Sequence, residues 1–225
     1  MRGCAVNKVD YKLNAIVDGG LRAVADLAVL ARIAADNGAT IIQYRDKQAS
    51  TRELVGQATA IRMALVGTGV PLVVNDRVDV ALAAGADGVH LGRDDMAPAT
   101  ARRLLGHDAI IGLTVKNDAD ADAVLAAPVD YACIGGVFET LSKRNPDPPV
   151  GLEGFSRLRI RMLPARPGMP VGAIAGIDVR RAGDVIRAGA SGVAVISGIF
   201  GAPDIAAATR AMRRAIDAAL EETRQ

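Results

Sequence analysis

The stretch NDRVDVALAAGADGVHLGRDD, residues 75–95, decides the fold that we predict for this chain. It follows one short apolar run, residues 71–74, and contains a second at residues 87–91, with a helical segment between them. If these runs are neighbouring parallel strands, both end at the same rim, and Asp76 and Asp95 converge there. Two carboxylates with no His or Cys cluster beside them favour a hard cation such as Mg²⁺.

The composition is that of a globular chain with an aliphatic core. Of the 225 residues, 50% are hydrophobic but only 3% are aromatic, and there is no Trp. This length suits one large domain, and α/β barrels commonly occupy it as one. The formal net charge of +2, with both signs interspersed, excludes the concentrated basic surface that is typical of nucleic-acid binding.

The cysteines and the amino-terminal residues both bear on the compartment. Cys4 and Cys133 lack the spacing of a metal or redox pair, and two isolated thiols suit a reducing cytosol. The first dozen residues carry no apolar segment typical of secretory signals, and no stretch approaches eighteen uncharged apolar residues. We therefore expect a cytoplasmic protein that does not enter the membrane.

Strand-like and helix-like segments alternate along the whole chain. Eight short apolar runs have strand character: residues 13–17, 40–44, 71–74, 87–91, 109–113, 130–134, 170–175 and 192–196. Each is followed by a helical segment: residues 21–37, from 50 or 51 to about 67, 78–84, 98–105, 118–127, 151–162, 179–188 and 204–222. Strands that are apolar on both faces suit a parallel sheet covered by helices. The pattern predicts an α/β fold, a single (β/α)₈ TIM-barrel domain over residues 1–225.

An open, doubly wound sheet is the competing fold. It has fewer strands and usually a glycine-rich turn after the first of them. Asp18, Gly19 and Gly20 follow the first run here and match the GxGxxG pattern poorly. The barrel is therefore the favoured prediction, and we expect function at the carboxyl ends of its strands.

Charged, amide and hydroxyl residues gather at the ends of the strand-like runs. In chain order they are Gln43, Arg45, Lys47, Asn75, Asp76, Asp94, Asp95, Thr114, Thr140, Ser142, Lys143 and Ser197, with Gly176 and Gly198 after the last two runs. Cations that face a carboxylate-held metal suit an anionic ligand such as a diphosphate. Glycines after the last two strands suit backbone contacts to a monophosphate.

Six segments form a further pattern. They are QYRDK (43–47), NDRVDVALAAGADGVHLGRDDM (75–96), GLTV (112–115), GGVFETLSK (135–143), AIAGI (173–177) and VAVISGIF (193–200). In this order they resemble the motifs of the thiamine-phosphate synthase family along nearly the whole chain. The resemblance implies a (β/α)₈ barrel that joins hydroxymethylpyrimidine diphosphate to a thiazole phosphate, with Mg²⁺, giving thiamine phosphate and diphosphate.

The resemblance also implies a role for each matching residue. The pyrimidine diphosphate would be contacted by Gln43, Arg45, Lys47 and Asn75, and Mg²⁺ would be bound by Asp76 and Asp95. Thr114 would lie on the diphosphate or pyrimidine side, and Thr140, Ser142 and Lys143 would lie between the substrates. The thiazole phosphate would be held by Gly176, Ile196 and Ser197. The implied reaction is an ionisation in which diphosphate leaves and the thiazole nitrogen attacks a pyrimidine methylene cation. Arg45, Lys47 and Lys143 would be catalytic because they stabilise the leaving charge together with Mg²⁺.

Several residues depart from the family pattern or admit a plainer interpretation. Ala175 replaces the first glycine of the usual Ile-Gly-Gly-Ile, which implies a tighter approach to the thiazole phosphate. Ser142 keeps the hydroxyl of a usual threonine, and it could merely cap a turn, as could Thr140. His90 lies inside a strand, and we expect it to be packed and hydrogen-bonded, outside the catalytic set.

Two other functions remain open from the sequence. A thiazole tautomerase is a related barrel that binds only the thiazole phosphate, and it need not keep Arg45, Lys47, Asn75 or Lys143, which are all present here. A non-catalytic sensor of thiamine phosphates would carry an effector domain, which no segment resembles. The expected partners are small-molecule substrates, with neither nucleic acid nor membrane, and a homo-oligomer is left open.

Overall fold

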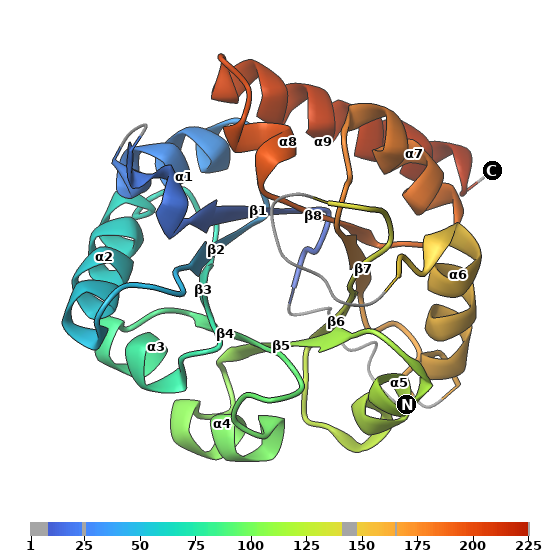
Figure 1. Cartoon of the computed structure of the whole chain (residues 1–225), viewed down its shortest axis with the longest axis horizontal. Helices are drawn as coiled ribbons and strands as arrows, with labels where there is room; N and C mark the ends of the chain where they lie inside the picture. Colours follow the sequence, from blue (N-terminus) through green and yellow to red (C-terminus); the bar gives the residue numbers. More distant parts are fainter. Residues whose placement is uncertain (1–8, 24–25, 141–147, 165, 225) are drawn as a thin grey trace.

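The computed structural model is a closed barrel of parallel strands (Figure 1), and it describes residues 9–23, 26–140, 148–164 and 166–224. The strands are β1 (Leu13–Asp18), β2 (Ile41–Arg45), β3 (Leu72–Asn75), β4 (Gly88–Leu91), β5 (Ile110–Val115), β6 (Tyr131–Ile134), β7 (Val171–Ile174) and β8 (Gly192–Val195). They follow chain order around the barrel, and β8 pairs with β1 to close it. The predicted (β/α)₈ fold is confirmed, whereas the extent of the domain, residues 1–225, stays a prediction.

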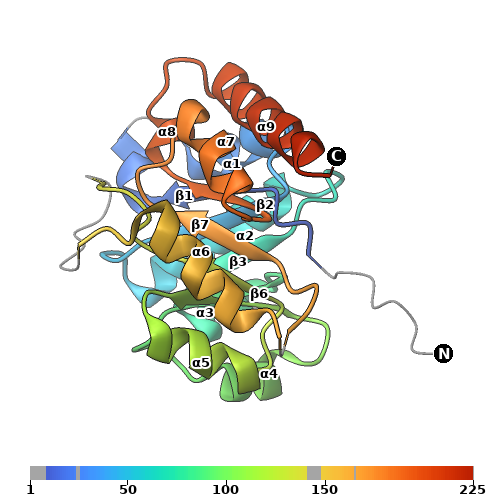
Figure 2. The ribbon, with the colours of Figure 1, turned by 90° about the vertical axis from the view of Figure 1, so that its right-hand side faces the viewer.

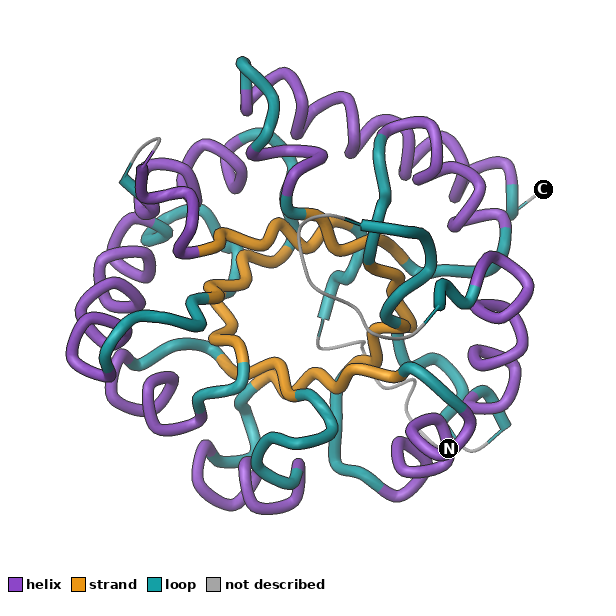
Figure 3. Tube along the Cα trace, in the orientation of Figure 1, coloured by secondary structure: helices purple, strands orange, loops and turns teal. Residues whose placement is uncertain are grey.

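Helices enclose the ring of strands on its outer side (Figure 3). They are α1 (Leu27–Asp36), α2 (Thr51–Ala64), α3 (Val78–Ala84), α4 (Pro98–Leu105), α5 (Asp118–Ala126), α6 (Gly151–Met162), α7 (Val179–Arg187) and α9 (Ile205–Glu222). Two shorter elements, η1 (Gly19–Ala23) and α8 (Ser197–Phe200), follow β1 and β8. Among the described residues, no helix combines the length and apolar character needed to cross a membrane.

The core has two layers. The outer layer, between strands and helices, is almost entirely aliphatic, as the composition predicted. The inner layer fills the barrel itself, and it consists of Val9, Tyr11, Ile16, Ile41, Val73, Ile110, Tyr131, Cys133 and Ala194. The rings of Tyr11 and Tyr131 lie 4.6 Å apart, centroid to centroid. Because Tyr131 begins β6, these rings close the barrel towards the amino-terminal ends of its strands and leave the other end for the site.

The first helix differs from the prediction. The sequence predicted one helix over residues 21–37, but α1 begins only at Leu27. Asp26 is its N-cap, with extended backbone angles, and its carboxylate accepts a hydrogen bond of 2.7 Å from the Ala28 N–H. An N-cap residue marks the amino-terminal end of its helix. The first residues of the predicted helix, residues 21–23, therefore belong to the separate short helix η1.

The second helix settles an alternative that the sequence left open. Ser50, and not Thr51, is its N-cap, and Glu53 completes a capping box by accepting from the Ser50 N–H at 2.8 Å. This cap determines where the chain turns after β2, and it therefore helps to orient the polar residues at the end of β2. Figure 2 shows the described loops that follow the strands at one end of the barrel.

Closure of the barrel requires glycine where β8 passes the chain before β1. A Cβ atom on Gly192 would lie 1.9 Å from the carbonyl oxygen of Tyr11 and 2.3 Å from that of Lys12. Because backbone would have to move, Gly192→Ala should lower the free energy of unfolding by about 2 kcal/mol or more in urea titrations.

The matched control is Gly56→Ala in α2, where an added Cβ meets nothing within 4 Å. Alanine is the better helix former, so this variant should gain about 0.5–1 kcal/mol. Equal stability of Gly192→Ala and the unmodified chain would contradict the closure argument.

Candidate functional site

A cavity of about 460 Å³ opens at the carboxyl ends of the strands. It brings together every predicted site residue that the structure describes: Gln43, Arg45, Lys47, Asn75, Asp76, Asp95, Thr114, Thr140, Gly176, Ile196 and Ser197. The predicted Ser142 and Lys143 lie outside the described residues. The rim that the sequence predicted is therefore one continuous site, although the roles of its residues stay predictions.

The end of β2 supplies one side of the cavity. Side chains alternate along a strand, so Gln43 and Arg45 face the barrel interior while Tyr44 packs among the outer aliphatic residues. Arg45 pairs with Asp18, which is its neighbour in the register between β1 and β2. Asp18 was missed as a functional residue, although it too ends a strand-like run. The ion pair holds the Arg45 guanidinium at the cavity wall, with only 17% of the side chain exposed.

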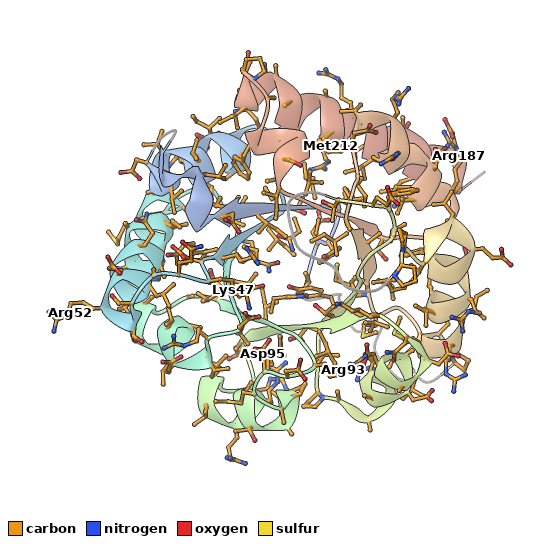
Figure 4. All side chains as sticks on the ribbon, viewed as in Figure 1. Lys47, Arg52, Arg93, Asp95, Arg187 and Met212 are labelled. Atoms are coloured by element: carbon orange, nitrogen blue, oxygen red, sulfur yellow. The ribbon has the colours of Figure 1, made fainter. Side chains whose placement is uncertain are left out.

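Lys47, Asp76 and Asp95 form a charged cluster beside it (Figure 4 labels Lys47 and Asp95). Burial acts to raise the pKa of Asp76, but hydrogen bonds with Lys47 and Asp95 and the charge of Lys47 outweigh it, so the pKa of Asp76 is lowered. Burial raises the pKa of Asp95, and contact with Asp76 raises it further. The two carboxylates thus meet as predicted, and they share an excess of negative charge.

The backbone fixes where these two carboxylates stand. Asp76 adopts a left-handed conformation with φ of +65°, and its N–H donates to the His90 carbonyl oxygen at 2.8 Å. The Asp95 carboxylate accepts from the Gly92 N–H at 2.7 Å, within the loop after β4. Both are therefore placed by main-chain hydrogen bonds. No group of three or more His, Cys, Asp or Glu that could hold a metal alone occurs among the described residues.

The floor of the cavity is polar and extensively hydrogen-bonded. Asn14 donates to Gln43, and Gln43 donates to Asn75, across three neighbouring strands. The imidazole of His90 bonds Tyr131 through Nδ1 at 3.0 Å and Thr114 through Nε2 at 2.8 Å. His90 is thus packed and hydrogen-bonded, as the plainer interpretation expected, but it also lines the cavity.

The loops after β6 and β7 are joined on the opposite side. The Phe138 N–H donates to the Ala175 carbonyl oxygen at 3.2 Å, and Arg181 donates to the Gly176 carbonyl oxygen at 2.7 Å. The same Arg181 guanidinium lies 4.7 Å from the centre of the Phe138 ring. A Cβ on Gly176 would lie 2.3 Å from the Glu139 carbonyl oxygen, so glycine is needed there. Ala175 adopts φ of +94°, a strained conformation for alanine.

The end of β8 contains an element that the sequence did not predict. The short helix α8 begins at Ser197, directly after Ile196, so both residues enter the cavity wall at a helix start. A Cβ on Gly198 would lie 2.9 Å from the Ile177 carbonyl oxygen, which shows how closely the ends of β7 and β8 approach. Four residues are too few to show a helical period, so pattern alone could not find this helix.

A second ion pair was missed between the loop after β4 and the first turn of α5. Arg93 donates to both carboxylate oxygens of Asp120, each at 2.9 Å, and Asp120 also accepts from the Lys116 N–H at 2.9 Å. Asp120 is only 9% exposed, and all three residues line the cavity. The only sequence signal was the position of Arg93 beside Asp94 in the rim segment. The pair ties the loop that carries Asp95 to the neighbouring βα unit.

Comparisons with known proteins agree on one family. The family model described as thiamine monophosphate synthase matches residues 13–199. A thiamine-phosphate synthase of Agrobacterium fabrum is 67% identical over 216 residues, covering 96% of this chain and 98% of that protein. One of Chloroflexus aurantiacus is 40% identical and covers 95% and 96%. The solved thiamine phosphate pyrophosphorylase of Pyrococcus furiosus has a TM-score of 0.80 at 34% identity, covering 95% of this chain and 98% of its own.

Strain at Ala175 predicts a stabilising substitution inside the site. Glycine adopts a φ of +94° without the clash of a Cβ, so Ala175→Gly should raise the free energy of unfolding by about 1 kcal/mol. Ala215→Gly, inside α9, should lower it by about 1 kcal/mol. Chemical denaturation measures both, and a loss of stability in Ala175→Gly would contradict the strain.

The opposite pKa shifts of Asp76 and Asp95 predict opposite effects of neutralising them. A lowered folded-state pKa means that the charge of Asp76 stabilises the fold above its unfolded pKa, and that this stability is lost as pH falls through the folded value. A raised folded-state pKa means that ionisation of Asp95 destabilises the fold as pH rises. At pH 7 without Mg²⁺, Asp76→Asn should lower the free energy of unfolding and Asp95→Asn should raise it, each by about 0.5 kcal/mol after allowance for solvent screening.

The pH dependence provides the control for these two variants. The effect of Asp95→Asn should vanish below the unfolded aspartate pKa of about 3.9, because the carboxyl is then protonated in both states. The effect of Asp76→Asn should persist to lower pH, because the folded-state pKa of Asp76 is lowered. Denaturation curves that shift in the same direction for both variants at pH 7 would contradict the assignment.

Proposed function

The chain belongs to the thiamine monophosphate synthase family and is a transferase of thiamine biosynthesis, and we propose that its cavity joins a pyrimidine diphosphate to a thiazole phosphate. The observation that carries this proposal is the cavity itself. It combines the cations Arg45 and Lys47 and the paired carboxylates Asp76 and Asp95 on one side with the glycine-containing end of β7, around Gly176, on the other, where a phosphate would bind. A volume of about 460 Å³ lies within the usual range for small-molecule pockets.

The diphosphate side is formed by the ends of β2 and β3. Arg45 presents a guanidinium held by Asp18, and Lys47 presents an ammonium on a side chain that is 53% exposed. Both can contact diphosphate oxygens, and Lys143, outside the described residues, would add a third cation. As the bond between the pyrimidine methylene carbon and oxygen breaks, diphosphate takes the electron pair, and these cations stabilise the charge that develops.

Asp76 and Asp95 have the donor chemistry for Mg²⁺. Two adjacent carboxylates, one with its pKa raised by burial and by contact with the other, form an anionic pair that a divalent cation would relieve. Two protein ligands are also what Mg²⁺ usually takes when phosphates and water complete its coordination. When bound there, Mg²⁺ would supply positive charge to the leaving diphosphate.

The thiazole phosphate would lie against the ends of β7 and β8. Gly176, Ile196 and Ser197 would hold the phosphate there, with Thr140 between the two substrates. The resemblance assigns the same place to Ser142, which lies outside the described residues. The task of these residues is orientation, because the thiazole nitrogen must meet the methylene cation as diphosphate leaves. Thr114 and the Gln43–Asn75 pair would hold the pyrimidine. The substrates are small molecules, a cytoplasmic location stays a prediction, and the oligomeric state stays open.

The test is diphosphate release from both substrates in the presence of Mg²⁺. Turnover should require all three components, and Asp76→Asn should lower kcat/KM by about 100-fold, because it removes a charge that would hold the metal. Asparagine suits the positive φ of this position, so the fold should be retained.

The control is Asp79→Asn, because Asp79 is a nearby carboxylate that pairs with Arg77 at the surface, away from the cavity. It should keep full activity. Binding of the thiazole phosphate without turnover would contradict the proposal and would favour a tautomerase-like enzyme or a sensor. Unchanged turnover in Asp76→Asn would contradict the metal assignment.

A further inference from the structure

Three side-chain amides form a directional chain beneath the cavity. The Asn14 Nδ2–H of β1 donates to Gln43 Oε1 of β2 at 2.9 Å, and the Gln43 Nε2–H donates to Asn75 Oδ1 at the end of β3 at 2.8 Å. Asn14 and Gln43 are 0% and 3% exposed. Gln43 and Asn75 line the cavity, but Asn14 does not. Asn14 therefore reaches the site only through the other two amides.

The direction of this chain decides which atom faces the substrate. Asn75 accepts with Oδ1, so its Nδ2 is left to donate, and no described residue accepts from it. If Gln43 alone turned over, two N–H groups would face each other at Asn14 and two oxygens at Asn75. Such contacts are repulsive, so the three amides keep one direction together.

Packing does not explain why position 14 carries an amide. The Asn14 Oδ1 atom is buried and makes no hydrogen bond of normal geometry among the described residues, and neither does the buried Tyr11 hydroxyl, which contacts the Asn14 side chain. An unpartnered buried oxygen is unfavourable, and leucine, which has nearly the same shape, would fill the same space without that cost. The donor to Gln43 is the contribution of Asn14 that an apolar residue could not make.

We propose that Asn14 is a positioning residue that sets the polarity of the Gln43–Asn75 pair, so that the cavity presents the Asn75 Nδ2–H as a donor to an acceptor atom of the pyrimidine diphosphate. The identity of that substrate rests on the function proposed above. The direction of the amide chain does not, because it follows from the two hydrogen bonds among the three side chains.

Two substitutions distinguish the effect of the Asn14 hydrogen-bond donor from the effect of the shape of its side chain. Asn14→Leu keeps the volume and removes the donor, so Gln43 and Asn75 can turn over, and the KM for the pyrimidine diphosphate should rise about fivefold. Asn14→Asp has the same shape, and a buried carboxyl with no cation beside it stays protonated. Its O–H donates to Gln43 Oε1, so this variant should keep the KM within about twofold of the unmodified enzyme.

The KM for the thiazole phosphate should not change in either variant. The control is Thr209→Val in α9, which removes a fully buried hydroxyl that donates to the Ile205 carbonyl oxygen, far from the cavity. Thr209→Val can lose stability, but both KM values should be unchanged. If Asn14→Leu does not fold, Asn14→Ser replaces it, since the shorter hydroxyl cannot reach Gln43.

A spectroscopic readout makes the test independent of turnover. In ¹⁵N correlation spectra, the side-chain amide signals of Gln43 and Asn75 should shift in Asn14→Leu and return in Asn14→Asp. Unchanged KM values and amide signals in Asn14→Leu, or an Asn14→Asp variant that behaves like Asn14→Leu, would overturn the proposal. If the unmodified chain releases no diphosphate, the proposed function fails, while the amide signals still decide the role of Asn14.

Discussion

Closure of the parallel strands in chain order is the constraint on which the site depends. Because all strands run in one direction, their carboxyl ends meet at one rim, and residues as distant in sequence as Gln43 and Ser197 line one cavity. The other end is filled by the rings of Tyr11 and Tyr131, which contact each other at a tilt of 39°. Each βα unit adds one or a few side chains, so cations, carboxylates, amides and glycines come together although no single unit holds them all.

The sequence predicts residues that follow a strand better than it predicts their partners. Their position at the end of the second strand-like run was enough to place Gln43 and Arg45 at the rim. The pairing of Arg45 with Asp18 depends on the register between β1 and β2, and an apolar pattern does not contain the register between strands that are separated by a helix. For the same reason the sequence did not predict the contact of Asn14 with Gln43. Asn14 stood out only as a polar residue inside an apolar run.

The hydrophobic pattern of the sequence also could not predict how residues after neighbouring strands contact one another. Arg93 and Asp120 come from different βα units, and they meet because the loop after β4 lies beside the first turn of α5. This pairing matters for the site because the carboxylate partner of each of these cations determines where the cation points. Arg45 is held by Asp18 with 17% of its side chain exposed, and Arg93 is held by hydrogen bonds to both carboxylate oxygens of Asp120, whereas Lys47 makes a single contact with Asp76. Lys47 is therefore the cation that can most readily exchange its partner for an incoming anion.

Backbone strain is concentrated in the cavity. Asp76 and Ala175 are the non-glycine residues with positive φ among those that the structure describes, and both line the cavity, on opposite sides. Each is held by a main-chain hydrogen bond from another unit, Asp76 to the His90 carbonyl and Ala175 from the Phe138 N–H. A strained conformation persists only where its surroundings determine it, and here the closed barrel and its joined loops do so. This explains why alanine is tolerated where glycine would be unstrained: the backbone path is fixed by the neighbouring loop, and the residue itself has only to follow it.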